Sequence, residues 1–222
     1  MRTSTSMSQP GGSFAVLQQK IAALWPACRR NFKPGLNLTD QGAPVSSIFF
    51  VTQGTIKASF IERSGREIIT NLHPATCVIG ADAALLESPS LITATTISDC
   101  EIYVVATRHF RELLQSNADF SFHMNRSMAR ETFNQTRAVI DASCGDARLR
   151  LVNLLRPETL AGYHQPPNKD LSASVLLKKS EIAKLLAITP EHLSRLIRRL
   201  KRDGILDRSN RKMSVVKEGP QG

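Results

Sequence analysis

Residues 178–203 constrain the fold of this chain more than any other stretch. They read KKSEIAKLLAITPEHLSRLIRRLKRD, and apolar side chains recur at helical spacing on both sides of a short break. Ser180 and Glu181 give a start signal for the first helix. Thr189 is a suitable N-cap for the second helix, and Pro190 then occupies a first helical position, where its missing N–H costs nothing. Two short helices joined so tightly predict a helix–turn–helix.

The second of these helices has one apolar face and one basic, polar face. Its apolar face is predicted to be buried and consists of Leu193, Leu196, Ile197 and Leu200. A helix–turn–helix places the start of its second helix in the DNA major groove, so Glu191, Ser194 and Arg195 are predicted to read base edges. Arginine can bind guanine through two hydrogen bonds, glutamate can accept from the cytosine amino group, and serine can do either. A helical hairpin with a solvated basic face is the alternative.

Contacts to DNA phosphates are predicted around the same helices and on a following hairpin. Gly204 is expected to end the second helix, and residues 205–216 have the pattern of strand, polar turn and strand that is typical of a wing. Such contacts position a protein on DNA without specifying a sequence. The side chains predicted to make them are Lys179, Ser180, Thr189, His192, Arg198, Arg199, Arg208, Arg211 and Lys212.

The charge of the chain also favours an anionic partner. Its 29 Lys and Arg residues outnumber 19 Asp and Glu residues, which gives a formal charge of +10, and the surplus is concentrated in residues 178–217. Double-stranded DNA is the predicted partner. A membrane surface is the rival anionic partner, but no apolar run approaches the ~20 residues that span a bilayer. No membrane association is predicted.

The N-terminal residues and the histidines bear on location and on catalysis. Residues 1–13 are polar and rich in Gly and Ser, without the pattern of a signal peptide, so they are predicted to form a disordered leader of a cytoplasmic protein. The five histidines stand in no HExxH, nucleophile-elbow or P-loop motif. Asp82 and Glu87 could be compared with a catalytic pair, yet loop acids are usually solvated. The chain is therefore predicted not to be an enzyme.

Upstream of residue 118 the hydrophobic period changes from helical to strand-like and back. Residues 14–25 have a helical period that Pro26 ends, and a second short helix is predicted at residues 108–115. Many short strands with regular turn signals between them indicate a β-sandwich or barrel, which we assign to residues 14–117 as a sensor domain. The predicted strands are residues 48–51, 56–61, 68–72, 91–97 and 101–105, with turns near Gly54 and Gly65.

A long helix is predicted at residues 118–142, with a break at Gly145 and a further helix at residues 147–155. Side chains near heptad spacing form an imperfect seam, which consists of Phe120, Met124, Met128, Gln135 and Val139. The seam either lines a two-fold dimer or packs on its own barrel. Because each recognition helix needs a partner about one DNA turn away, a homodimer is predicted. Residues 118–144 are then the dimerisation helix and hinge, and residues 145–222 the winged helix–turn–helix domain.

Three segments resemble the Crp/Fnr (cAMP receptor protein/fumarate-nitrate regulator) family. They are IFFVTQGTIKASFIERSGREI at residues 48–68, DARLRLVNLL at residues 146–155 and EIAKLLAITPEHLSRLIRRLKRDGIL at residues 181–206. The resemblance implies an α+β chain with a cyclic-nucleotide-binding-like β-barrel (a jelly roll), a long dimerisation helix and a C-terminal winged helix–turn–helix. It also implies a homodimeric, sequence-specific transcription regulator that contacts RNA polymerase.

Two details of the resemblance concern the helix–turn–helix. The spacing of Glu191, Ser194 and Arg195 resembles the Fnr-like branch, which implies a palindromic DNA site with TTGAT-like half-sites. Ala187 stands where the family more often has glycine, and alanine should fit only if that residue avoids positive φ. The alternative function is a ligand-binding regulatory protein that acts through protein contacts or non-specific nucleic-acid contacts.

A pocket for an effector is predicted by the same resemblance. Cyclic-nucleotide binders of this family hold the phosphate with a Gly-Glu-x-Gly-type loop and a following arginine. Here Ala81 replaces the glutamate of the ribose contact and Ser90 replaces the arginine, so a buried phosphate would lack a cation and cAMP is not expected. The residues predicted to line the pocket are Gly80, Ala81, Asp82, Ser90, Leu91 and Thr93.

The scattered cysteines bear on other signals. Cys28, Cys77, Cys100 and Cys144 include no C-x-x-C pair, so neither a zinc site nor a redox pair is predicted. An iron–sulfur cluster is not expected, because it normally takes four thiolates and the first 76 residues contain Cys28 alone. The alternatives that remain are haem held by His73 or Cys77, a peroxide-sensing Cys77 or Cys100, and a small organic effector or none at all; no cofactor is predicted.

Overall fold

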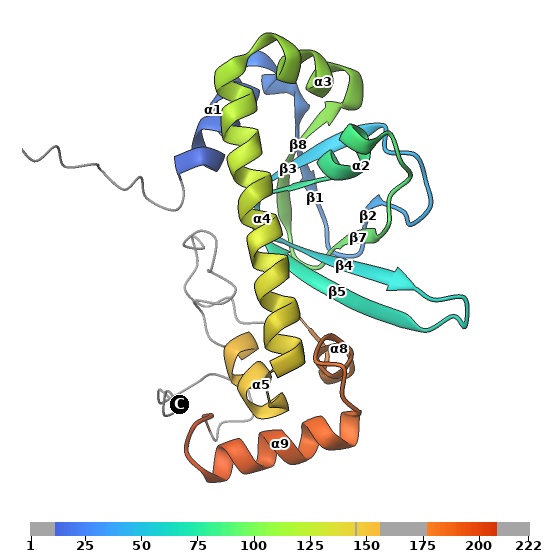
Figure 1. The fold of residues 1–222 in the computed structure, drawn as a ribbon, viewed down its shortest axis with the longest axis vertical. Coiled ribbons are helices and arrows are strands. Elements are labelled where there is room, and N and C mark those ends of the chain that lie inside the picture. Colours follow the sequence, from blue (N-terminus) through green and yellow to red (C-terminus); the bar gives the residue numbers. More distant parts are fainter. Residues whose placement is uncertain (1–11, 145, 156–176, 208–222) are drawn as a thin grey trace, which may run out of the picture.

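A computed structural model describes residues 12–144, 146–155 and 177–207. The first part of the chain forms a β-domain, a long helix α4 (Ala118–Cys144) runs along it, and a small helical unit lies at the far end of that helix (Figure 1). We call this unit the head; it comprises α5 (Ala147–Leu155), α8 (Lys179–Leu185) and α9 (Pro190–Arg202). Most of the predicted leader and the predicted wing lie outside the described residues.

The β-domain consists of two antiparallel four-stranded sheets, as the predicted sandwich or jelly-roll barrel requires. The sheet orders are β1-β8-β3-β6 and β2-β7-β4-β5. Their strands are β1 (Arg29–Phe32), β2 (Asn37–Thr39), β3 (Ser47–Gln53), β4 (Thr55–Ile61), β5 (Glu67–Pro74), β6 (Cys77–Ile79), β7 (Thr93–Thr96) and β8 (Cys100–Ala106). The strand prediction at residues 91–97 was too long, and β1, β2 and β6 were not predicted.

Strands β4 and β5 form a hairpin at the side of the β-domain, and α8 of the head lies against β5 (Figure 1). Its turn contains Gly65 at a φ of +82°, and the preceding turn contains Gly54 at +97°. At Gly54 a Cβ atom would lie only 2.6 Å from the carbonyl oxygen of Asp99, so this position combines a left-handed backbone with a close approach. Both predicted turns are confirmed.

The helices of the first part of the chain lie close to the predicted positions. They are α1 (Gly12–Leu24), the 3₁₀ turn η1 (Pro26–Cys28), the unpredicted short helix α2 (Ala81–Leu86), and α3 (Thr107–Ser116). The prediction that residues 1–13 form a disordered leader was wrong at its end, because Gly12 and Ser13 belong to α1 and Ser13 is buried.

Helix α4 is fixed on its own β-domain by an aromatic cluster. Phe50, Phe110 and Phe120 are fully buried, with ring centroids 6.2–6.4 Å apart. Such tilted and edge-to-face pairs each add ~0.5–1.5 kcal/mol beyond the burial of their area. Met124 is buried in the same core.

The predicted seam on α4 is therefore corrected. Phe120 and Met124 face the core of their own domain, and Met128 is half-buried against it. Of the five predicted seam residues, Gln135 and Val139 are exposed. The sequence left open whether this seam lines a dimer or packs on its own barrel, and Phe120, Met124 and Met128 follow the second alternative.

The head has its own apolar core, and one strand of the β-domain contributes to it. Leucine, isoleucine and valine side chains from α5, α8 and α9 pack together, among them Leu155, Ile182 and Leu200 at 0% exposure. Leu72 from β5 joins this cluster. The head is thus packed directly against the β4–β5 hairpin.

Among the described residues, no helix has the length and apolar character that crossing a membrane would demand.

Candidate nucleic-acid interface and effector cavity

Helices α8 and α9 form the predicted helix–turn–helix, and both helix starts are capped. The hydroxyl oxygen Oγ1 of Thr189 accepts a hydrogen bond from the backbone N–H of His192 at 3.2 Å, as an N-cap does. Helix α8 begins one residue earlier than predicted, because the Glu181 carboxylate accepts from the backbone N–H of Lys178 at 3.0 Å. Ser180 therefore lies inside the first turn.

The turn between the two helices contains a strained residue. Ala187 has a φ of +52°, whereas the sequence required it to avoid positive φ. That expectation was wrong. The backbone bonds Ala187 N to Lys184 O, at 3.1 Å, and Ile188 N to Ala183 O, at 3.0 Å, close the end of α8 and hold the left-handed geometry.

The two faces of α9 are arranged as the sequence predicts. Leu193, Ile197 and Leu200 are buried, and Leu196 is half-buried. Glu191, Ser194 and Arg195 are exposed and line one open depression together with Pro190 and Arg198. The buried leucine side thus fixes which three polar side chains point outwards.

The Glu191 carboxylate is held in its charged form. It accepts hydrogen bonds from its own backbone N–H and from the Thr189 hydroxyl, and the nearby Arg195 adds an attraction, so the pKa of Glu191 lies below its usual value. An ionised carboxylate can only accept hydrogen bonds, which suits the amino group of cytosine.

The predicted phosphate contacts divide into three groups. Lys179, Ser180, His192, Arg198 and Arg199 are exposed around the helix–turn–helix. Thr189 is also exposed, but its hydroxyl already serves as the helix cap. The last three predicted residues, Arg208, Arg211 and Lys212, lie outside the described part of the chain.

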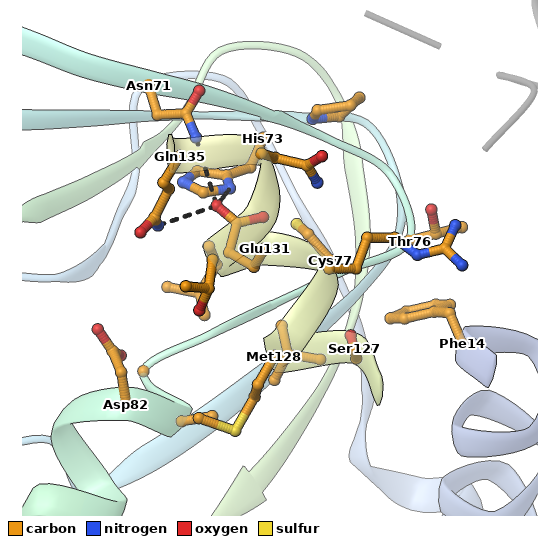
Figure 2. Close-up of a pocket in the computed structure, with 18 of the residues that line it drawn as sticks. Phe14, Asn71, His73, Thr76, Cys77, Asp82, Ser127, Met128, Glu131 and Gln135 are labelled. Carbon is orange, nitrogen blue, oxygen red and sulfur yellow. Dashed lines mark hydrogen bonds and ion pairs between the residues drawn. The ribbon is translucent and has the colours of Figure 1, made fainter. Parts of the chain in front are cut away.

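A cavity of about 230 Å³ lies between the β-domain and α4 (Figure 2). Gly80, Ala81, Asp82 and Ser90 line it as predicted. Leu91 and Thr93 do not: Leu91 is 76% exposed, and the Thr93 hydroxyl accepts from the backbone N–H of Gln41 instead. Residues 91 and 92 form a bend that the Ser90 hydroxyl closes by hydrogen bonds to the backbone of Ile92, and Ser90 and Ile92 line the cavity.

Glu131 on α4 is the polar centre of the cavity, and the sequence analysis missed it. Its Oε1 accepts from Gln135 Nε2 at 3.1 Å and from Asn71 Nδ2 at 3.4 Å, and it lies 3.6 Å from His73 Nδ1 (Figure 2). The signal was present in the sequence, because Ser127, Glu131 and Gln135 recur every four residues and so form one polar stripe of a helix.

His73 and Cys77 both line the cavity, and burial controls the chemistry of each. Burial lowers the pKa of His73 despite the attraction of Glu131 and Asp82, so the imidazole is neutral at pH 7. Burial raises the pKa of Cys77 and that of Cys100, and both thiols stay protonated. A protonated thiol is a poor metal ligand and a poor peroxide nucleophile. Among the described residues, no group of three or more His, Cys, Asp or Glu side chains could hold a metal ion.

Comparison with known proteins identifies relatives of both parts of the chain. The family "Cyclic nucleotide-binding domain" matches residues 29–117, and the family "Crp-like helix-turn-helix domain" matches residues 150–218. The transcriptional regulatory protein btr of Bordetella pertussis is 24% identical over 82% of this chain and 74% of its own length. The cAMP-activated global transcriptional regulator CRP of Pasteurella multocida is 23% identical over 73% of this chain and 78% of its own length.

A solved structure shares the fold. The c-di-GMP-responsive global regulator CLP of Xanthomonas campestris superposes with a TM-score of 0.70 at 17% identity, over 90% of this chain and all of that one. At this level of identity the likeness concerns the fold alone.

The strained turn gives a stability prediction. Replacing Ala187 by Gly should raise the free energy of unfolding by roughly 0.5–1 kcal/mol, because relief of the left-handed strain outweighs the greater freedom of glycine in the unfolded chain. Ala183→Gly is the matched control, and it should destabilise by about 1 kcal/mol or more, because Ala183 is a buried helical residue. Urea unfolding of both variants measures the difference. Equal destabilisation by the two changes would contradict the assignment of strain to residue 187.

Proposed function

Because this chain belongs to the Crp/Fnr family of transcription regulators, we propose that it binds a palindromic, TTGAT-like DNA site as a homodimer under the control of an effector in its sensor cavity. DNA binding and transcription regulation follow from the family. The observation that carries the more specific proposal is the outward placement of Glu191, Ser194 and Arg195 on a capped helix with a buried back. Contact with RNA polymerase and a place in the cytoplasm, where bacterial DNA lies, belong to the same proposal, as does action by binding rather than catalysis.

The three outward side chains support reading of a mixed sequence. Arg195 supplies a fork of donors for guanine, Glu191 supplies an acceptor for cytosine, and Ser194 lies between them on the same depression. The basic residues beside them would then hold phosphates. This division separates the specific part of binding from the electrostatic part.

Replacement of Arg195 by Ala tests the reading of bases. The variant should lose about 1–3 kcal/mol of binding free energy on a TTGAT-N4-ATCAA duplex and little on a scrambled duplex, because only the specific site offers the guanine contact. Fluorescence anisotropy at ~150 mM salt measures both affinities. Arg199→Ala is the matched control, since it removes the same charge at a predicted phosphate contact and should weaken both duplexes about equally. Equal affinity of the wild-type chain for both duplexes would instead favour the alternative of non-specific contacts.

The homodimer is supported by an exposed apolar stripe on α4. Phe122, Phe133 and Ile140 are 55–68% exposed, and with the exposed Ala129 they recur at spacings of seven, four and seven residues. This is the heptad spacing of a two-stranded coiled coil. A second copy of α4 is the partner that we propose for this stripe, in place of the seam predicted from the sequence.

Replacement of Phe133 by Glu tests this stripe. A charge in the middle of the contact should dissociate the dimer and weaken binding to the palindrome more than tenfold, because two half-sites would then be bound separately. Leu86→Glu is the matched control: Leu86 is 77% exposed on α2, away from the stripe, and its change should leave the dimer intact. Analytical ultracentrifugation gives the mass of each variant. A Phe133→Glu dimer as stable as the wild-type dimer would refute the stripe.

The charges of the cavity support an effector other than a cyclic nucleotide. Its lining includes the carboxyl groups of Asp82 and Glu131 and the guanidinium of Arg130, while burial keeps His73 uncharged. Ala81 and Ser90, in the place of the family's glutamate and arginine, offer the phosphate no charge. A phosphodiester would therefore enter a cavity in which acids outnumber bases. We propose a small organic effector; haem on His73 or Cys77 is the alternative, which an absent Soret band after addition of haemin would exclude.

Titration with cAMP tests the effector proposal. Isothermal titration calorimetry of the purified chain should give no binding heat, because the acids Asp82 and Glu131 outnumber Arg130 in the cavity lining and Ser90 stands in the place of the phosphate-binding arginine. The cAMP-activated regulator of Pasteurella multocida, titrated in the same buffer, is the positive control. Micromolar affinity for cAMP would contradict the proposal.

A further inference from the structure

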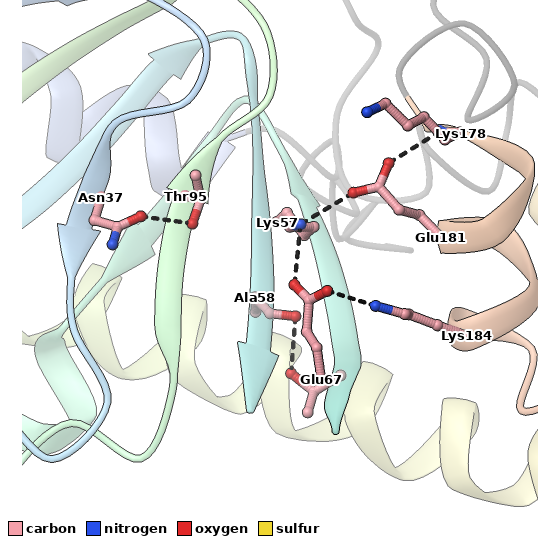
Figure 3. Close-up of polar contacts among 9 residues, drawn as sticks. Asn37, Lys57, Ala58, Glu67, Thr95, Lys178, Glu181 and Lys184 are labelled. Carbon is pink, nitrogen blue, oxygen red and sulfur yellow. Dashed lines mark hydrogen bonds and ion pairs between the residues drawn. The ribbon is translucent and has the colours of Figure 1, made fainter. Parts of the chain in front are cut away.

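Four charged side chains connect the β4–β5 hairpin to the head (Figure 3). Lys57 of β4 lies between two carboxylates, with its Nζ 3.1 Å from Glu67 Oε1 and 3.0 Å from Glu181 Oε1. The other oxygen of Glu67 is 2.8 Å from the Nζ of Lys184. Negative and positive charges thus alternate from Glu181 of α8, through the hairpin, to Lys184 of α8. We call these four residues the charge bridge.

The charge bridge is better shielded from water than an ordinary surface pair. The side chains of Lys57, Glu181 and Glu67 are 14%, 22% and 28% exposed, and Lys184 is 42% exposed. Each of the two carboxylates contacts a lysine of the other structural unit. Isolated ion pairs on the surface contribute little to stability. The charge bridge contributes more because it is partly buried and forms a network.

The protonation of the bridge is set by its own hydrogen bonds. The hydrogen bond from Lys184 lowers the pKa of Glu67. Burial opposes the charged form of Glu181, but hydrogen bonds from the Lys178 backbone and from Lys57 outweigh it, and the pKa of Glu181 is lowered too. Groups with lowered carboxyl pKa values stabilise the contact at neutral pH and lose that effect as the pH falls through those values.

Strand β5 connects the bridge to the sensor cavity. Leu72 packs in the apolar core of the head and also lines the cavity, together with its neighbours Asn71 and His73. The same strand therefore contacts both the head and the cavity. Glu67 lies at the start of the same strand.

We propose that the charge bridge docks the head on the β4–β5 hairpin in the DNA-free protein and so sets the orientation in which α9 meets DNA. The bridge leaves the depression around Glu191, Ser194 and Arg195 open, so docking orients the reading surface without covering it. A head that is already docked loses less orientational freedom on binding a half-site than a freely moving head does. Docking therefore lowers the entropic cost of binding two half-sites at once. The inference rests on the proposed function for its effect on DNA, and on the structure alone for docking.

Zero-length cross-linking tests docking without DNA. A carbodiimide activates a carboxylate, and an adjacent lysine amine then displaces the urea and forms an amide. In the full chain, mass spectrometry should find the cross-links Lys57–Glu181 and Glu67–Lys184. The pair Lys20–Asp119, 2.9 Å apart between α1 and α4, is the internal control, because it does not depend on the head. The control cross-link without the two bridge cross-links would overturn the proposal.

Glu67→Gln removes the central charge of the bridge, and Glu62→Gln is its matched control. Glu62 lies on the same hairpin, and its carboxylate accepts hydrogen bonds from Ser64 and Arg66 of its own turn. Both changes remove one negative charge from the hairpin. Glu67→Gln should lower the yield of the Lys57–Glu181 cross-link severalfold relative to Lys20–Asp119, whereas Glu62→Gln should leave that ratio unchanged. Equal yields in both variants would contradict the role of Glu67.

The effect on DNA is then measured with the same pair of variants. Glu67→Gln should weaken binding to the palindrome by about three- to tenfold, because apparent affinity falls with the fraction of heads in the competent orientation. Glu62→Gln should bind as the wild type does. Unchanged or tighter binding by Glu67→Gln would overturn the orienting role. If the wild-type chain failed to recognise the palindrome while the bridge cross-links formed, the proposed DNA site would fail and the docked head would stand.

Discussion

The burial of Phe120 and Met124 against the β-domain is the contact on which the rest of the structure depends. It fixes the rotation of α4 about its own axis, and this rotation determines the direction in which every other side chain of the helix points. Once these two side chains point into the core, Glu131 must face the cavity and Phe133 must face outwards. A single aromatic cluster therefore decides which face of α4 closes the cavity and which apolar stripe stays exposed.

The head depends on α4 for its place and on β5 for its orientation. Helix α5 begins three residues after the last residue of α4, and Leu72 of β5 contributes to the apolar core of the head. The charge bridge restricts the position of the head on the hairpin, because its ion pairs require particular side chains to meet. Apolar packing alone would allow the two surfaces to shift against each other. The exposed polar face of α9 is thus held by a series of contacts that starts in the β-domain.

The sequence predicted best where one local pattern is sufficient. The caps and periodicity of residues 178–203 gave the helix–turn–helix and the outward face of α9, and alternation gave the central strands. It failed where partners are distant: β1 pairs with β8 across some seventy residues, and nothing local marks it. The cavity was half predicted, because the loop at Gly80 carries a motif, whereas Glu131 became a cavity residue only through the packing of α4. Ala187 shows that hydrogen bonds of a turn can impose a conformation that its side chain disfavours.

The position of Glu131 next to the exposed stripe has a consequence for how the protein would respond to rising effector concentration. Glu131 and Phe133 are two residues apart on α4, one facing the cavity and the other facing outwards. In a dimer built on that stripe, a molecule that moves α4 in one protomer also moves the surface against which the other protomer packs. Occupancy of the first cavity then changes the affinity of the second, and the response to the effector becomes cooperative.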